Sequence, residues 1–327
     1  MQKGLLVGTI AATGLWAWIR HLQLPVGPSR MHWGAQVFGH RGCRNIPNVP
    51  ENTLEAFAFA KDHGATGIEL DVRLSKDEVL VVYHDAFLGT HVKDAASQRR
   101  VDDLTVAEIK MLNFAADPTN SVRIPTLEEC ILYCKENKLK MLIELKELKQ
   151  VDVCATKLVE LFQRYPEYLY SETTVIAFSP FALYAVRKKD RSIAVGQLFS
   201  GESIQHVVKN KIEAYPKFYE YCPSLLDFFL TILQTRIAPW FVGTTMICPK
   251  YTLFKESFKK KWHRRNICVY VWGFSEPEEC APIMRVEGVL VACDDRHEEF
   301  APTKRPPNFD IFGDEERKEE VRRKLTK

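Results

Sequence analysis

The feature that most constrains this chain is an alternation of short apolar runs with longer helical patterns between about residue 35 and residue 293. Runs of about four to eight apolar, β-branched or aromatic residues indicate buried strands, and apolar residues at helical spacing indicate helices. This alternation predicts a parallel sheet built from βα units. We expect eight strands, at residues 35–40, 66–71, 79–84, 140–145, 173–179, 193–198, 267–272 and 288–293. Eight strands of this kind predict a closed barrel.

Helical patterns are expected at residues 52–63, 126–138 and 151–164. The interval between Asp71 and Val79 differs, because its seven residues are too few for a helical crossover. An extended return would place Asp71 and His84 on one rim of an irregular barrel, whereas a simple hairpin would place them at opposite ends. The sequence leaves both arrangements open.

The composition excludes several classes of protein. Of the 327 residues, 46% are hydrophobic and 27% are charged, which is typical of a folded chain with a sizeable core. The net charge of +3 is too small for a dedicated nucleic-acid binder, so no nucleic-acid partner is expected. The nine cysteines are scattered without CxxC pairs, a pattern that favours buried thiols over a zinc site or a disulfide scaffold.

An uncharged run of sixteen residues, 4–19, stands near the N-terminus and is closed by Arg20 and His21. A membrane span needs about 20 apolar residues, so the run is at the short limit of that range, and its two tryptophans suit a membrane interface. An uncleaved anchor is favoured over a signal peptide because no small-x-small cleavage site precedes Arg20. We therefore expect a single-pass or N-terminally anchored protein of an endomembrane or the plasma membrane.

Three parts of the chain are expected. They are a membrane anchor at residues 1–30, a barrel domain at 35–300 and a charged tail at 301–327. Within the barrel, the apolar stretch 221–243 is either a buried crossover helix or an interfacial contact with membrane lipid. The basic stretch 255–265, with six Lys or Arg and Trp262, is either a solvated helix face or a contact with anionic lipid.

Polar side chains stand at the ends of the first two expected strands. His40 and Arg41 follow the first strand, and Glu69 and Asp71 are two residues apart on the second. Alternate residues of a strand share one face, so the two carboxylates are expected side by side. Such a pair favours a hard cation, Mg²⁺ or Ca²⁺, because two close like charges need a cation or a raised pKa to coexist.

The next two expected strands end in the same way. His84 and Asp85 close the run at 79–84, and Glu144 and Lys146 lie two residues apart on the strand at 140–145. Glu144 is a third carboxylate for the metal, and the Lys146 ammonium is placed to hold a phosphate oxygen. Each pair alone is compatible with a solvated face, but barrel active sites lie where strands end.

These strand ends belong to an ordered set of motifs: HRG at 40–42, PENT at 50–53, ELDV at 69–72, HD at 84–85, ELK at 144–146 and VWG at 271–273. Together they resemble the glycerophosphodiester phosphodiesterase family, and the chain is most similar to its membrane-bound animal members. The resemblance covers about residues 35–300. It implies an irregular TIM barrel of the PLC-like phosphodiesterase type, carrying in this chain an N-terminal hydrophobic anchor helix.

The resemblance also implies an activity. It is the metal-dependent hydrolysis of glycerophosphodiesters, or of lysophospholipids in the manner of a lysophospholipase D, to glycerol 3-phosphate or lysophosphatidate plus an alcohol. The implied partners are that substrate and membrane lipid. The alcohol is left open among inositol, choline, ethanolamine and an N-acylethanolamine.

Site roles follow from the same resemblance. The implied acid/base pair is His40 and His84, since imidazole is the side chain that changes charge near neutral pH. The implied metal ligands are Glu69, Asp71, Glu144 and, in the assignment given to some members, His84. The implied substrate-binding residues are Arg41 and Lys146 at the phosphate and Trp272 as an apolar wall.

Two departures from the family pattern concern substrate range. Gly273, Phe274 and Ser275 follow the motif tryptophan where Thr-Val-Asn is usual, and Cys293 stands where Thr often precedes the aspartate. Neither change removes an implied ligand or histidine. The alternatives are a catalytically weak, membrane-associated lipid-binding barrel and a nuclease, and the near-neutral charge disfavours the nuclease.

Overall fold

The structure, a computed structural model, describes residues 17–44, 46–93, 98–203, 221–274, 277–284, 286 and 288–294. The expected tail at 301–327 lies outside the described residues, and so does most of the uncharged run at 4–19. Residues 17–22 are helical. Residues 24–33 pack against the barrel, where Arg30 donates hydrogen bonds to the carbonyls of Tyr170 and Thr173.

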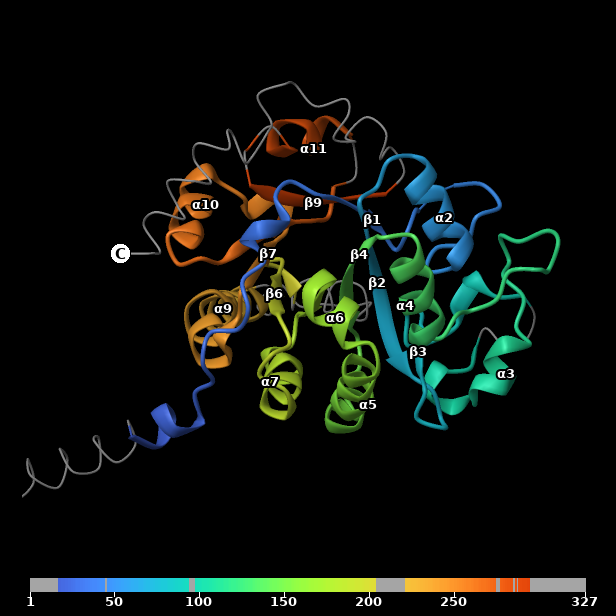
Figure 1. Cartoon of the computed structure of the whole chain (residues 1–327), viewed down its shortest axis with the longest axis horizontal. Helices are drawn as coiled ribbons and strands as arrows, with labels where there is room; N and C mark the ends of the chain where they lie inside the picture. The colour runs from blue at the N-terminus through green and yellow to red at the C-terminus, as the bar shows by residue number, and fades with distance from the viewer. Residues whose placement is uncertain are drawn as a thin grey trace, which may run out of the picture.

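Eight parallel strands close into a barrel, in which each strand pairs with the next along the chain and the last pairs with the first. They are β1 (Val37–His40), β2 (Gly67–Leu74), β4 (Lys140–Leu145), β5 (Thr173–Ala177), β6 (Val195–Phe199), β7 (Met246–Pro249), β8 (Cys268–Val271) and β9 (Val289–Cys293). Figure 1 shows the helices arranged outside these strands. The predicted irregular TIM (β/α)8 barrel is confirmed.

The membership of the barrel differs from the prediction. The strand expected at 79–84 is β3 (Leu80–Val82), which pairs antiparallel with β2 and lies outside the closed ring. The eighth barrel strand is instead β7, a four-residue segment that the sequence reading missed. Its letters, MICP, give too short a pattern and end in proline. Pairing with β6 and β8, rather than local composition, makes this segment a strand.

The β2–β3 hairpin brings Asp71 and His84 to the same rim. Asp71 lies three residues before the end of β2, which continues to Leu74. The returning strand pairs Val82 with Val72, and the Tyr83 backbone N–H donates to the Asp71 carbonyl at 2.9 Å. The segment is therefore a hairpin, but Asp71 and His84 are not at opposite ends of it. The turn lies beyond the rim, so the chain that returns along β3 ends opposite Asp71.

The α-helices of the described residues are α2 (Leu54–Asp62), α3 (Val106–Lys110), α4 (Leu127–Glu136), α5 (Val151–Arg164), α6 (Pro166–Glu172), α7 (Pro180–Lys189), α9 (Tyr221–Ile232), α10 (Glu256–His263) and α11 (Pro277–Met284). The π-helical turns η6 (Leu233–Ile237) and η7 (Pro239–Gly243) continue α9. Short 3₁₀ turns are η1 (Met31–Trp33), η2 (Gly89–His91), η4 (Val101–Asp103) and η8 (Tyr251–Leu253).

The helices predicted at 52–63, 126–138 and 151–164 are confirmed as α2, α4 and α5. Thr53 and Thr126 cap α2 and α4 by accepting hydrogen bonds from backbone N–H groups of the first turn.

The side chains inside the barrel change from apolar to charged along its axis. Its lower part is filled by apolar side chains such as Phe38, Leu142 and Ile176, with Trp33 packed against them. The inward-facing residues nearer the carboxyl ends of β2 and β4 are carboxylates instead. A packed floor beneath a polar rim leaves the chemistry to the carboxyl-terminal end of the barrel.

The segment between β3 and α4 builds a separate small core beside His84. Leu88, Val101, Ile109 and Phe114 are buried in it, together with Tyr83. Because this core lies outside the ring of strands, it extends the wall of the rim on the β2 side.

Candidate active site

The turn after β1 is shaped by two glycines. A Cβ atom on Gly39 would lie 2.1 Å from the Gly42 carbonyl oxygen, and one on Gly42 would lie 2.7 Å from the Phe57 ring. Between them, Arg41 adopts a φ of 55°, in the left-handed region that side chains rarely occupy. In this conformation its backbone N–H donates to Glu69 Oε2 at 3.1 Å. The turn thus ties the end of β1 to the carboxylate on β2.

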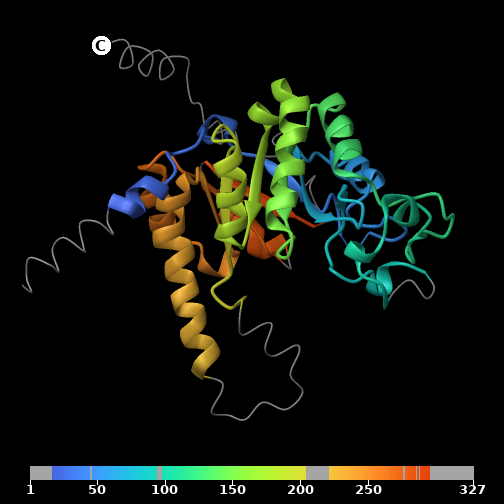
Figure 2. The same cartoon turned by 90° about the horizontal axis from the view of Figure 1, so that it is seen from below.

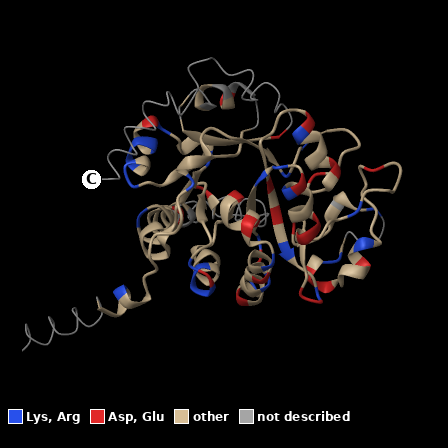
Figure 3. Ribbon diagram, in the orientation of Figure 1, with Lys and Arg blue, Asp and Glu red and all other residues tan. Residues whose placement is uncertain are grey.

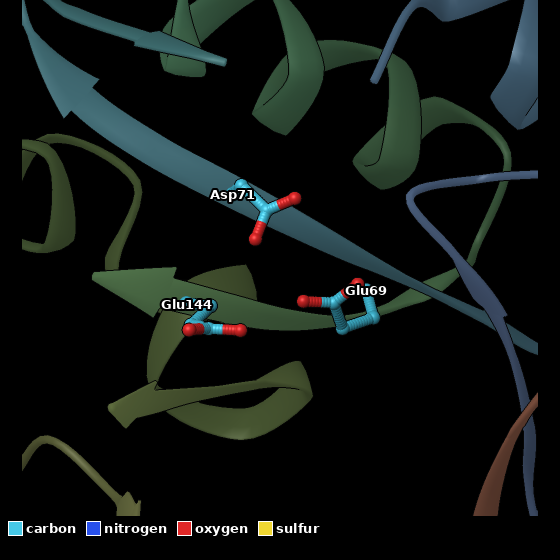
Figure 4. Close-up of side chains that lie close together, drawn as sticks. All are labelled: Glu69, Asp71 and Glu144. Atoms are coloured by element: carbon cyan, nitrogen blue, oxygen red, sulfur yellow. The ribbon is translucent and has the colours of Figure 1, made fainter. Parts of the chain in front are cut away.

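Three buried carboxylates converge at the rim. Glu69 and Asp71 come from β2 and Glu144 from β4, and one oxygen of each lies within 4.8 Å of the others. Figure 4 shows the three side chains pointing toward one another. Their relative exposures are 2%, 1% and 7%, so water does not screen their mutual repulsion effectively.

The close approach of the three carboxylates changes the pKa of Glu69. Burial, followed by the neighbouring Asp71 and Glu144 carboxylates, raises the pKa of Glu69 well above its usual range. The site therefore favours either a proton on Glu69 or a cation among the three carboxylates.

Two cationic side chains neutralise part of this charge. Lys146 Nζ lies 2.7 Å from Glu144 Oε1 and 3.1 Å from Asp71 Oδ1, and Arg41 Nε lies 3.4 Å from Asp71 Oδ2. Burial opposes ionisation of Asp71, but Lys146, then His84, then Arg41 outweigh it and hold its pKa below the usual range. The amide of Asn52 also donates to Asp71 Oδ2 at 2.9 Å.

The donor set fits a hard divalent cation. Three carboxylates face only two basic side chains, so the cluster retains an excess negative charge when all its groups are ionised. Its oxygens are the ligands that Mg²⁺ and Ca²⁺ prefer, and water or phosphate oxygens can complete the shell of such an ion.

His40 is oriented by a carboxylate from the last strand. Its Nδ1 lies 2.5 Å from Asp294 Oδ1, immediately after β9, and its Nε2 lies 3.9 Å from Glu69 Oε2. Burial raises the pKa of Asp294, but the hydrogen bond to His40 and the charges of His40 and Arg44 outweigh that effect and lower it. An ionised carboxylate only accepts, so Nδ1 carries the proton and Nε2 faces the cluster.

His84 has a similar arrangement on the other side of the cluster. Its Nδ1 lies 2.8 Å from Asp85 Oδ1, and His91 Nε2 lies 3.8 Å from Asp85 Oδ2. Asp85 therefore holds His84 in the same tautomer as Asp294 holds His40. His84 is not among the groups that converge within 4.8 Å in the described chain.

A pocket of about 240 Å³ opens beside His84. One wall is the loop after β1, with Val49, Glu51 and Asn52, and the other includes Phe114 of the small core and the nearby Ala116. Since Asn52 also bonds Asp71, the pocket adjoins the carboxylate cluster.

The opposite side of the rim is aromatic. Trp272 follows β8, and its indole N–H donates to the Cys248 carbonyl at 2.9 Å. Its ring meets Phe178 edge to face, with ring centres 5.4 Å apart. The predicted wall residue thus has a partner that the sequence reading did not identify.

The sequence reading also missed residues that orient the predicted site. Asn52 belongs to the PENT motif, which was recognised without a role for this residue, and Asp294 was noted only as a strand-end residue. Glu51 accepts hydrogen bonds from Arg41 and Arg44 at 2.7 and 3.2 Å. Phe178 had no signal that separates it from a core residue. The structure brings His40, Arg41, Glu69, Asp71, His84, Glu144 and Lys146 together on one half of the rim and places Trp272 on the other.

Comparison with known sequences gives a consistent result. The model of the Glycerophosphoryl diester phosphodiesterase family matches residues 40–295. Glycerophosphodiester phosphodiesterase 1 of Mus musculus is 28% identical over 249 residues, which cover 74% of this chain and 72% of that protein. A glycerophosphodiester phosphodiesterase of Caldanaerobacter subterraneus is 32% identical over 201 residues, covering 58% of this chain and 79% of that protein.

Solved structures share the fold. An Oleispira antarctica phosphodiesterase in complex with the product sn-glycerol-3-phosphate matches with a TM-score of 0.64 at 19% identity, covering 84% of this chain and 99% of that one. A glycerophosphodiester phosphodiesterase from Parabacteroides distasonis matches with a TM-score of 0.58 at 22% identity, covering 81% and 94%. At these identities the similarity supports the barrel fold.

Proposed function

Because this chain belongs to the glycerophosphoryl diester phosphodiesterase family and is a phosphoric diester hydrolase, we propose that its substrates include lysophospholipids as well as glycerophosphodiesters. The products would be lysophosphatidate or glycerol 3-phosphate and a free alcohol. The observation that carries the proposal is one rim that combines three converging carboxylates with two histidines, each oriented by its own aspartate.

In this proposal Glu69, Asp71 and Glu144 hold one Mg²⁺ or Ca²⁺. When bound, the ion neutralises charge on the non-bridging phosphate oxygens. Lys146 and Arg41, already in contact with the cluster, add positive charge on the same side. Together these basic groups orient the phosphate and favour the extra negative charge of the transition state.

The two histidines divide the proton transfers. His40 accepts a proton at Nε2 from the attacking water, whose oxygen forms the new bond to phosphorus. His84, protonated on both ring nitrogens, donates its Nε2 proton to the alcohol oxygen as the bond between that oxygen and phosphorus breaks. Asp294 accepts from Nδ1 of His40, which leaves Nε2 free to take a proton, and Asp85 accepts from Nδ1 of His84, which leaves the Nε2–H of the protonated ring to donate.

The two halves of the diester occupy different sides of the rim. The pocket beside His84 receives the departing alcohol, since His84 lines that pocket. The glyceryl half, with the acyl chain of a lysophospholipid, lies against Trp272 and Phe178. An apolar wall there accounts for acceptance of an acylated glycerol.

We also propose that the protein works at a membrane, with an anchor within residues 1–30, of which 24–30 pack against the barrel, 35–300 as the catalytic domain and 301–327 as a charged tail. The uncharged run at 4–19 supports an anchor, and an acylated substrate would be supplied from lipid.

Product release from a panel of substrates tests the proposal. The panel contains glycerophosphocholine, glycerophosphoethanolamine, glycerophosphoinositol and the corresponding lysophospholipids, with EDTA added and then Mg²⁺ or Ca²⁺ restored. We expect metal-dependent release of the alcohol from both substrate classes. Release from glycerophosphodiesters alone would reject the lysophospholipase D activity.

A further inference from the structure

The helix that connects β6 to β7 is longer than the barrel is deep. Its stretch Ser224–Gly243 has 20 residues and, within the described chain, is the one helix long and apolar enough to cross a membrane. Twenty helical residues span about 30 Å, whereas a five-residue strand spans about 17 Å. Because the helix returns from the rim to the base of the barrel, its N-terminal half extends beyond the rim. Figure 2 shows that half, in orange, standing clear of the strands.

Large apolar side chains cover the outside of this helix and the helical turn beside it. We call them the α9 outer surface: Leu225, Leu226, Phe228, Phe229, Ile237, Trp240 and Trp18, each between 45% and 60% exposed. At roughly 100 Å² for each half-exposed side chain, the seven residues offer on the order of 700 Å², more than the roughly 300–600 Å² of the largest apolar patch on a typical soluble monomer.

The inner side of the same helix carries two buried polar residues. Asp227 and Gln234 are each 2% exposed, and the Gln234 amide donates to the Phe178 carbonyl at 2.9 Å. Helix α5 has the opposite pattern, with Leu158 and Phe162 facing the barrel. Large exposed apolar side chains, on a helix whose buried side includes polar residues, indicate that the outside of α9 meets a phase other than water.

The lower half of the helix is bound to the barrel on one side. Ala238 and Val242 are buried, and the Leu24 N–H donates to the Phe241 carbonyl at 2.9 Å. A Cβ atom on Gly243 would lie 2.1 Å from the Pro25 carbonyl oxygen. A spanning helix would have to leave these contacts, so the folded barrel allows lipid to reach only the outer side.

The charges that border the surface are basic. Arg236 is the only exposed charged residue of residues 224–243, and it lies close enough to Lys261 of α10 to affect its ionisation. Burial, then Arg236 and Arg265, lower the pKa of Lys261. None of these three basic groups forms an ion pair with a carboxylate of the described residues. Figure 3 shows α9 almost without charged residues next to the basic α10. Unpaired cations beside an apolar surface complement anionic lipid headgroups.

The surface also continues into the N-terminal segment. The Arg20 guanidinium lies over the Trp240 ring, 6.0 Å from its centre, and the Gln23 amide donates to the Trp240 carbonyl at 3.1 Å. In the sequence, the uncharged run 4–19 contains Trp18. The chain expected to enter the membrane therefore meets the barrel at one end of the α9 outer surface.

We propose that the α9 outer surface lies in the interfacial layer of a membrane containing anionic lipid, with the helix parallel to the membrane plane. Amphipathic helices bind in this way, with their apolar side at the boundary between headgroups and acyl chains. The inference deepens the proposed work at a membrane by naming the surface that docks. Through Gln234 and Phe178, the docked helix adjoins the aromatic side of the rim, so an acyl chain has a short path from lipid to Trp272.

Environment-sensitive fluorescence in the full chain tests the proposal without requiring turnover. Phe229→Cys and Ile237→Cys are labelled with a nitrobenzoxadiazole probe, and Leu132→Cys on α4 is the matched exposed control. The eight cysteines that the structure describes as free are buried, and labelled wild-type protein gives the background. Vesicles of phosphatidylcholine with 30% phosphatidylserine are then added, carrying doxyl quenchers at either the fifth or the twelfth acyl carbon.

The expected result is a blue shift at positions 229 and 237, stronger quenching by the shallow label, and no change at position 132. Probes at 229 and 237 that stay in water while the protein is bound to vesicles would overturn the proposal. Stronger quenching by the deep label would indicate a spanning helix and reject the parallel placement. A shift without lipid, accompanied by dimer formation, would assign the surface to a second copy of the chain.

A second comparison separates docking from catalysis. The double variant Leu226→Ser, Phe229→Ser should lower turnover of lysophospholipid in vesicles at least about fivefold and leave turnover of soluble glycerophosphocholine unchanged. Met111→Ser, at the exposed residue that follows α3, is the matched control and should change neither rate. Equal loss on both substrates would show a general folding defect and reject a docking role for these side chains. If neither substrate is turned over by the wild-type protein, the proposed function is rejected. The fluorescence experiment still shows whether the α9 outer surface binds the membrane.

Discussion

The two halves of the rim are built from different chemistry. On the side of β1, β2 and β4, nearly every inward side chain is charged or titratable, and each is held by another charged group. On the side of β5, β7 and β8, Phe178 and Trp272 form an aromatic wall, and the Trp272 indole N–H donates to the Cys248 carbonyl. In the proposed mechanism, the difference assigns the phosphodiester chemistry to the charged half and the choice of the group carried by the phosphate to the aromatic half.

The largest effect is expected from removing a metal ligand in the charged half. Glu69→Gln should lower kcat/KM for glycerophosphocholine about 10³-fold or more, because metal ions contribute several kcal/mol of transition-state stabilisation. Burial, and then repulsion from Asp71 and Glu144, raise the pKa of Glu69; glutamine carries no charge, so thermal unfolding in EDTA should show no loss of stability. Activity and Tm measured together check both halves of this prediction. If the Glu69→Gln variant showed the same metal dependence as the wild-type protein, Glu69 would not be a metal ligand.

Removing either histidine should have the next largest effect. His40→Ala and His84→Ala should each lower kcat about 10² to 10⁴-fold, the usual contribution of general acid–base catalysis, without changing the circular dichroism spectrum. Steady-state kinetics at saturating metal is the measurement. Near wild-type kcat in one variant would exclude that histidine from proton transfer.

A change in the aromatic half should affect binding more than chemistry. Trp272→Ala should raise KM for a lysophospholipid roughly tenfold and change kcat much less, since it removes apolar contact with the glyceryl half. Phe178→Leu serves as a milder companion. An equal fall in kcat with unchanged KM would place Trp272 with the charged half and abolish the distinction between the two.

The smallest effect concerns the pH dependence of metal binding. Because the pKa of Glu69 is raised without metal, a proton competes for the site at a pH higher than the ordinary value of about 4.3 for glutamate. Mg²⁺ affinity should therefore be constant at high pH and fall as pH drops through the raised pKa, with proton release on binding. Calorimetry at several pH values and in two buffers measures both. Affinity that stays constant down to pH 5 would contradict the raised pKa.

The contrast also explains what the sequence could predict. His40, Glu69, Asp71, Glu144 and Lys146 lie at strand ends in local patterns whose spacing places their side chains on one face. The barrel itself follows from the same alternation of strands and helices. Local patterns were therefore sufficient to identify these five side chains, although not the residues that orient them.

Other features depend on pairings between distant segments. The β7 strand exists because Met246–Pro249 pairs with β6 and β8, while β3 has a clearer strand pattern and lies outside the ring. Asp294 reaches His40 across 254 residues of sequence, and Phe178 looks like an ordinary core residue until Trp272 is seen beside it. Nothing local in the sequence reports such contacts.

The central claim is that phosphodiester cleavage depends on one divalent ion held by the charged half of the rim. The most direct test follows cleavage of glycerophosphocholine by ³¹P NMR while Mg²⁺ or Ca²⁺ is titrated into metal-free protein, with bound metal counted in parallel. The account predicts no cleavage without metal and full activity at one ion per chain. Cleavage by folded, metal-free protein, or activity that requires no ion at Glu69, Asp71 and Glu144, would contradict it.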